Sequence, residues 1–217
     1  MRKMYRYLDK LLAEEKKRVR VEFNRIGVMG FDELNVVNTR KTTQDMFDRL
    51  LKDNIALYLK SAKNAYKKGV QSAKNAGLKG KEEEITEPWV LEMLAGFNIV
   101  TNYLYDKEAE RKRLRLNEQI LTAREFSDRQ LFNNCLRRTA NLWWTQTTQY
   151  GISAVDEATL KAYRDMGVKR VQWIAADDEK TCPTCGERDN RIYPINKIPP
   201  KPHYGCRCYI VPVRAKE

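Results

Sequence analysis

Four cysteines and the only histidine of the chain stand close together near its C-terminal end. They form two short motifs, Cys182-x-x-Cys185 and His203-x-x-Cys206-x-Cys208. Thiolate sulfur and imidazole nitrogen are the ligands of structural zinc sites, and two ligand pairs on two turns can close a tetrahedron around the ion. The residue types and their spacing therefore predict a zinc centre of structural type.

Five candidate ligands are present for the four positions around a zinc ion. Cys-x-x-Cys and His-x-x-Cys share one spacing, which favours the set Cys182, Cys185, His203 and Cys206. Cys208 follows Cys206 by two residues, so both side chains point to one face of an expected strand and Cys208 could replace His203 or pack beneath the site. The alternative is two disulfides formed on exposure to an oxidant. We favour zinc, because a reducing cytoplasm keeps clustered cysteines available as metal ligands.

The residues around these motifs predict a small β-structure. Alternating and β-branched side chains favour three short strands, at 171–175, 192–193 and 206–211. Cys185-Gly186 and Asp189-Asn190 are expected to form tight turns, and the proline-rich run 198–202 a stiff extended loop.

Apolar residues at helical spacing predict that the rest of the chain is α-helical. The expected helices cover residues 1–26, 42–75, 86–105, 107–122 and 127–166, with an irregular segment at 31–40 and a bend at Gly151. Cys135 lies on the apolar side of the last helix and is interpreted as a buried apolar residue. The expected fold class is mainly α: a helical body over residues 1–168 and a small Cys/His module with short antiparallel strands over residues 169–217.

The charge balance favours a polyanionic partner. The chain has 41 Lys and Arg against 29 Asp and Glu, a net charge of +12, and nucleic acid is the simplest such partner. Two basic runs are the candidate contacts: Lys16, Lys17, Arg18 and Arg20, and Arg111, Lys112, Arg113 and Arg115. The alternative interpretation is a pair of solvated helix faces.

The N-terminal residues lead into a charged helix without the apolar region of a signal peptide. The longest apolar stretch, 89–100, is broken by Glu92 and Asn98 and is shorter than the ~20 residues that cross a bilayer. We therefore expect synthesis in the cytoplasm and no membrane partner.

The sequence does not favour an enzyme. Asp177, Asp178 and Glu179 precede the first cysteine motif, and small cysteine-knuckled nucleases are the catalytic alternative. Nucleases of the His-Asn-His type, however, need an imidazole as general base and further His or Asn groups on a second metal. If His203 binds zinc, no histidine remains for that role. Asp178 is then a turn residue or an ion-pair partner, and we predict no catalytic residue.

The order of residues in the C-terminal part resembles the signature of phage head morphogenesis proteins, the minor head proteins of the phage Mu F-like type. The resemblance covers about residues 130–213. It rests on Trp173, Asp178, Thr181-Cys182, Cys185, Asp189, Pro202-His203, Cys206-Arg207-Cys208 and Pro212-Val213, and the upstream runs 137–141 and 162–168 are similar to the helical part that precedes this signature. Two positions depart from the family pattern: Ala140 stands where an acidic residue is common, and Asn190 where glycine is common.

The resemblance implies a minor capsid protein of a tailed phage. Such a protein associates with the portal protein and with capsid or scaffolding protein during assembly in the host cytoplasm. It then resides in the virion, in the capsid interior or at the portal vertex, and is linked to packaging or ejection of double-stranded DNA. The alternative is a zinc-ribbon nucleic-acid-binding protein that is not part of a virion. The position of the gene beside portal and scaffold genes would favour the first.

Overall fold

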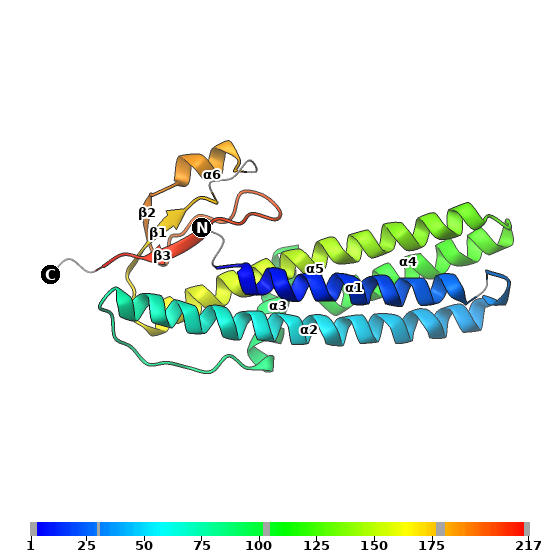
Figure 1. Cartoon of the computed structure of the whole chain (residues 1–217), viewed down its shortest axis with the longest axis horizontal. Coiled ribbons are helices and arrows are strands. Elements are labelled where there is room, and N and C mark those ends of the chain that lie inside the picture. The colour runs from blue at the N-terminus through cyan, green and yellow to red at the C-terminus, as the bar shows by residue number, and fades with distance from the viewer. Residues whose placement is uncertain (1–3, 30, 102–104, 177–180, 215–217) are drawn as a thin grey trace. The chain divides into compact units, whose positions relative to one another are not determined.

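The computed structural model of the chain describes residues 4–29, 31–101, 105–176 and 181–214. Its helices are α1 (Arg6–Val28), α2 (Val36–Asn75), α3 (Glu87–Thr101), α4 (Tyr105–Glu125), α5 (Arg129–Asp165) and α6 (Pro183–Arg188), with a short 3-10 helix η1 (Phe31–Glu33) (Figure 1). The strands are β1 (Arg170–Ile174), β2 (Ile192–Pro194) and β3 (Tyr209–Pro212). The expected fold class, a mainly helical chain with a small β-containing Cys/His module at its C-terminal end, is confirmed. Of the described helices, none is both long enough and apolar enough to cross a membrane.

Helix α2 begins earlier than the sequence predicts. Asn35 accepts a hydrogen bond from the Asn38 amide through its side-chain oxygen (2.9 Å), so it caps a helix that starts at Val36. The expected irregular segment 31–40 is therefore wrong for its second half, 36–40. The bend expected at Gly151 is also wrong, because α5 continues through it as one helix and Gly151 is buried there. A glycine weakens a helix by only ~1 kcal/mol, which packing can offset.

Other helix ends follow the sequence signals. The Thr86 hydroxyl accepts from the Trp89 amide (3.4 Å) at the start of α3, and Asp128 Oδ1 accepts from the Leu131 amide (2.8 Å) at the start of α5. Gly167 has a φ of +69° after the last turn of α5, where the Val168 amide donates to Tyr163 O (2.9 Å). Glycine adopts this left-handed conformation without strain, so it ends the helix.

The chain divides into two compact units, which are described separately. Unit 1 consists of Met1–Leu11, Tyr58–Val90 and Gln149–Glu217, and unit 2 of Leu12–Leu57 and Leu91–Thr148. These boundaries differ from the predicted division after residue 168, because segments of α1, α2 and α5 cluster with the strands in unit 1.

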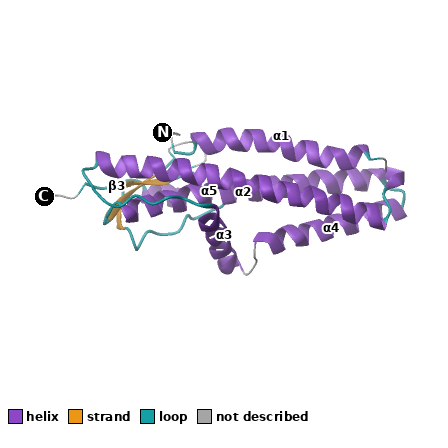
Figure 2. Cartoon of the chain, turned by 90° about the horizontal axis from the view of Figure 1, so that it is seen from below, coloured by secondary structure: helices purple, strands orange, loops and turns teal. Residues whose placement is uncertain are grey.

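In unit 1 the three strands form an antiparallel sheet in the order β2-β1-β3. Val171 pairs with Tyr193 on one side and Trp173 with Ile210 on the other. The segments of α2 and α5 that belong to this unit lie side by side (Figure 2). Their approach is close, since a Cβ placed on Gly69 would lie 2.7 Å from the Ala162 Cβ.

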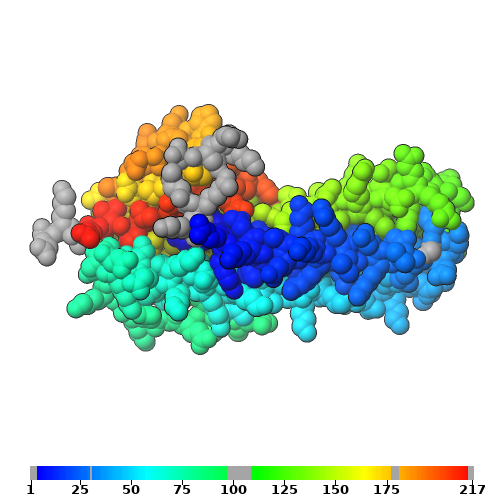
Figure 3. Space-filling view, in the orientation of Figure 1, coloured from blue at the N-terminus to red at the C-terminus, as the bar shows by residue number. Residues whose placement is uncertain are grey.

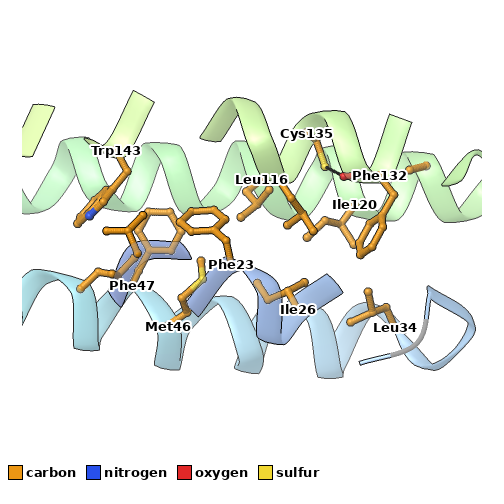
Figure 4. Packing of buried hydrophobic residues seen from close by; sticks show 14 of the residues in the cluster. Phe23, Ile26, Leu34, Met46, Phe47, Leu116, Ile120, Phe132, Cys135 and Trp143 are labelled. Atoms are coloured by element: carbon orange, nitrogen blue, oxygen red, sulfur yellow. Dashed lines mark hydrogen bonds between the residues drawn. The ribbon is translucent and has the colours of Figure 1, made fainter. Parts of the chain in front are cut away.

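Unit 2 has a large apolar core, to which α1, α2, α4 and α5 contribute. One side of α1 buries Val19, Phe23 and Ile26, while its opposite side is exposed along the helix (blue in Figure 3). The buried residues include Phe47 and Trp143, whose rings meet edge to face at 5.2 Å (Figure 4).

Cys135 belongs to the same core. It is buried, its thiol lies 3.0 Å from Phe132 O, and burial raises its pKa to about 11. The prediction that it is a buried apolar residue, not a reactive thiol, is in line with this environment.

Candidate metal centre

The first cysteine pair lies on a short helix, not on the tight turn expected at Cys185-Gly186. Cys182 is the N-terminal cap of α6, and Pro183 occupies the first helical position. The Cys185 amide donates to Cys182 Sγ (3.4 Å), and Cys182 O accepts from the Gly186 amide (3.0 Å). One helical turn therefore places both sulfur atoms on the same side of the helix start.

The second group of ligands precedes β3. The third strand was expected to start at Cys206, but β3 starts at Tyr209, so Cys206 and Cys208 lie in the irregular segment before it. Gly205 has a φ of +72°, and its amide donates to the side chain of Gln149 at 2.8 Å. Both Cys206 and Cys208 are buried, whereas His203 is exposed.

The five predicted ligands meet around Cys185. Its Sγ lies 3.6 Å from His203 Nε2 and 3.6 Å from Cys206 Sγ. Cys182, Cys185 and His203 form one trio, and Cys185, Cys206 and Cys208 a second; within each trio the ligand atoms are at most 4.8 Å apart. These residues could hold a metal ion, and the ligands predicted from the sequence are brought together. The favoured set, Cys182, Cys185, His203 and Cys206, takes residues from both trios. Cys208 belongs to the second trio and therefore stays an alternative ligand.

The distances suit a tetrahedral site better than a disulfide. With Zn–S near 2.3 Å and Zn–N near 2.0 Å, the edges of a tetrahedron are about 3.8 Å between sulfurs and about 3.5 Å between sulfur and nitrogen. A disulfide brings the two sulfurs to about 2.05 Å. All five cysteines are free thiols in the structure, and the sulfurs of Cys185 and Cys206 are 3.6 Å apart.

Burial disfavours negative charge on these sulfurs. It raises the pKa of Cys185, and hydrogen bonds with the thiols of Cys208, Cys182 and Cys206 raise it further. Burial also raises the pKa of Cys206, although the Cys208 amide and the Lys201 ammonium group favour its thiolate. A coordinated cation would offset the cost of ionising these groups, so metal binding here would release protons.

A polar network beside the cluster was not predicted. The Lys201 ammonium group donates to Tyr5 Oη (2.7 Å) and to Cys206 O (3.0 Å), and it pairs with Asp156 Oδ2 at 2.6 Å. The Tyr5 hydroxyl donates to Asp156 Oδ1 (2.6 Å) and lies 3.1 Å from Cys208 O. Burial, followed by the charge of Asp156, raises the pKa of Tyr5 well above its usual range. The network therefore connects the carbonyls of two candidate ligands to residues at the start of the chain and in α5.

The predicted nucleic-acid contacts lie on two helices of unit 2. Lys16, Lys17, Arg18 and Arg20 are exposed on α1; on α4, Arg111 and Arg115 are exposed, while Lys112 and Arg113 are half-buried. Arg18 pairs with Glu15 (3.3 Å) and Arg113 with Glu110 (3.9 Å). Asp177, Asp178 and Glu179 lie outside the described residues.

Comparison with protein-family models, curated proteins and solved structures finds no match to this chain.

Proposed function

We propose that the Cys/His cluster holds a structural zinc ion. Three thiolates with one imidazole, or four thiolates, form closed tetrahedral zinc sites without an open position for a substrate. The 3.6 Å separations at Cys185 and the burial of three of the five ligands support this proposal. Protein purified under reducing conditions should contain about one zinc per chain, released by a chelator. Metal-free protein with five titratable thiols and unchanged stability in chelator would rule the site out.

We propose a structural role for His203 in preference to general-base catalysis. Its Nε2 lies 3.6 Å from Cys185 Sγ, and its Nδ1 lies 3.0 Å from Tyr204 O. Both ring nitrogens thus have a neighbour, whereas a general base needs one nitrogen directed at the substrate.

We further propose that the chain is a minor head protein of a tailed phage, which associates with the portal, the procapsid and DNA. One observation carries this proposal beyond the resemblance itself. Trp173, Cys185, Cys206 and Cys208, which carry the resemblance, pack in one buried cluster. Residues on which the resemblance rests, although separated in the sequence, therefore pack in the same core.

The test is a pull-down of the tagged chain from infected cells, with mass spectrometry of purified mature particles. Recovery of the portal protein, and presence of the chain in particles, would support the head-protein proposal. Absence from both would exclude it. Sequence-specific DNA binding by a chain that is absent from particles would support the zinc-ribbon alternative.

A further inference from the structure

The positive charge of the chain is concentrated in unit 1. This unit has 23 Lys and Arg against 14 Asp and Glu, a net charge of +9; unit 2 has 18 against 15, a net charge of +3. One segment of unit 1 is especially one-sided. From Asn54 to Lys81 the chain has seven lysines and no Asp, Glu or Arg. Neither basic run predicted from the sequence lies in this segment.

Four of these lysines form a row on one side of α2. Lys60, Lys63, Lys67 and Lys74 follow one another at intervals of three, four and seven residues and are all exposed. Residues at these intervals share a helix face, so their ammonium groups lie along one line that spans about 21 Å of helix. We call these four residues the lysine row.

The surroundings of the row indicate which partner it fits. The apolar residues of the same stretch, including Ala62, Tyr66 and Val70, are buried inside unit 1. Protein interfaces have apolar or aromatic centres and are depleted in lysine, and a helix that lies on a membrane inserts an apolar face. The lysine row offers neither an apolar interface centre nor an apolar face for a membrane. A phosphate backbone requires only cations in reach of its charges.

We propose that the lysine row binds the phosphate backbone of double-stranded DNA. This inference rests on the proposed function, in which DNA is a partner, and it assigns the contact to a surface that the sequence did not indicate. Lysine contacts phosphate as a point charge, so binding at the row is independent of base sequence.

The loop after α2 limits the charge that the row can offer. Its three consecutive glutamates are each paired with a lysine: Glu82 with Lys74 (2.5 Å), Glu83 with Lys161 (2.5 Å) and Glu84 with Lys63 (3.2 Å). The Glu83 amide also donates to the hydroxyl of Tyr66 at 2.7 Å, which holds the loop on α2. Among the described residues, Lys60 and Lys67 have no such ion pair. The row therefore consists of two lysines facing solvent and two that share their charge with the loop.

The proposal is tested with the full chain and a short fluorescent DNA duplex, by anisotropy titrations over a range of salt concentrations. The loss variant is K60Q/K67Q. Its matched control is K41Q/K52Q, which removes two exposed lysines from the same helix outside the row. Each phosphate contact contributes about 0.9 to the slope of log affinity against log salt. We expect the loss variant to lower that slope by about 2 and the control to leave it nearly unchanged.

The gain variant is E82Q/E84Q, which releases Lys63 and Lys74 from their ion pairs. It should bind DNA more tightly than the wild type and with a steeper salt dependence, a result that partial unfolding would not produce. Equal slopes for the loss variant and its control, or no gain in E82Q/E84Q, would overturn the assignment to the row while leaving DNA binding intact. A wild-type chain that binds anionic vesicles or an acidic peptide but not DNA would overturn the DNA part of the proposed function as well.

Discussion

Unit 2 and the C-terminal module of unit 1 are stabilised by different interactions. Unit 2 buries large side chains such as Phe23, Phe47 and Trp143 in one extensive core. In the module, the cluster around the candidate ligands buries Trp173, Ala175 and three cysteines. A small β-structure buries too little apolar surface to be stable alone, so cross-links usually supply the rest. We therefore expect a bound metal to control the folding of the module and to leave unit 2 unaffected.

The largest effect should follow from Cys185→Ser. Cys185 is the residue that the two ligand trios share, so its loss leaves neither trio intact. Structural zinc contributes about 10–16 kcal/mol in small zinc-dependent folds. We expect loss of the metal and unfolding from about Trp173 onward, seen as C-terminal trimming in limited proteolysis with most of the helical circular dichroism retained.

Cys135→Ser is the control for that experiment. Cys135 is buried in unit 2 and is not one of the candidate ligands, and serine can still donate to Phe132 O. Metal content and the proteolysis pattern of the module should stay as in the wild type. If both cysteine variants lost the module equally, its folding would not depend on a metal held by Cys185.

The second-largest effect should follow from a substitution in the core of unit 2. Trp143→Ala removes a side chain that is 2 % exposed and packs against Phe47. Truncation of a buried aromatic residue costs about 3–5 kcal/mol. Hydrogen exchange should show this loss in the described parts of α1, α2 and α5 within unit 2. Addition of a chelator to the wild type should leave the same amides unchanged and deprotect those of β1 to β3. Equal deprotection of both sets of amides by chelator would contradict the expectation that metal stabilises the module and not unit 2.

A smaller effect should follow from Lys201→Met. This substitution keeps much of the aliphatic stem but leaves Asp156 and Cys206 O without the ammonium group that contacts both. Both side chains of the ion pair are partly exposed, at 22% for Lys201 and 27% for Asp156, so solvent limits the loss to about 1–3 kcal/mol. The midpoint of module unfolding in urea should fall. Lys197→Met, at an exposed lysine of the same loop region, is the control and should not change it.

The sequence predicts the parts of the fold that depend on near neighbours. The cysteine and histidine spacings indicated all five candidate ligands that the structure brings together, because each motif is short. Asn190 was expected in a turn and has a φ of 60°. Contacts between residues far apart in the sequence have no local sequence pattern of this kind. The bond between Lys201 and Tyr5 joins residues 196 positions apart, so no local pattern could indicate it. The lysine row has no such local signal either, because its members are three to seven residues apart on α2 and do not form a basic run.

The smallest effect should follow from a substitution of Glu15, the one charged residue of unit 2 that is buried among the residues with described side chains. The side chain of Glu15 has an exposure of 0%, and its Oε1 has no hydrogen-bond partner among the described residues. Burial, followed by the negative charge of Asp53, raises the pKa of Glu15, while Arg18 lowers it in part. A carboxyl group with a raised pKa in the folded state favours folding while it is protonated and opposes folding once it ionises.

Glu15→Gln should therefore stabilise unit 2 at neutral pH, by on the order of 1 kcal/mol, because an uncharged amide replaces a poorly satisfied buried carboxylate. At a pH below the unfolded pKa of glutamate, both states are protonated and the variant should have no advantage. The advantage should grow as the pH rises toward the folded pKa and then stay constant. Hydrogen exchange of the α1 amides near Glu15, measured at acidic and neutral pH, gives the difference, and exposed Glu14→Gln is the matched control. A variant that is less stable than the wild type at neutral pH would show that the pair of Glu15 with Arg18 outweighs the cost of burial.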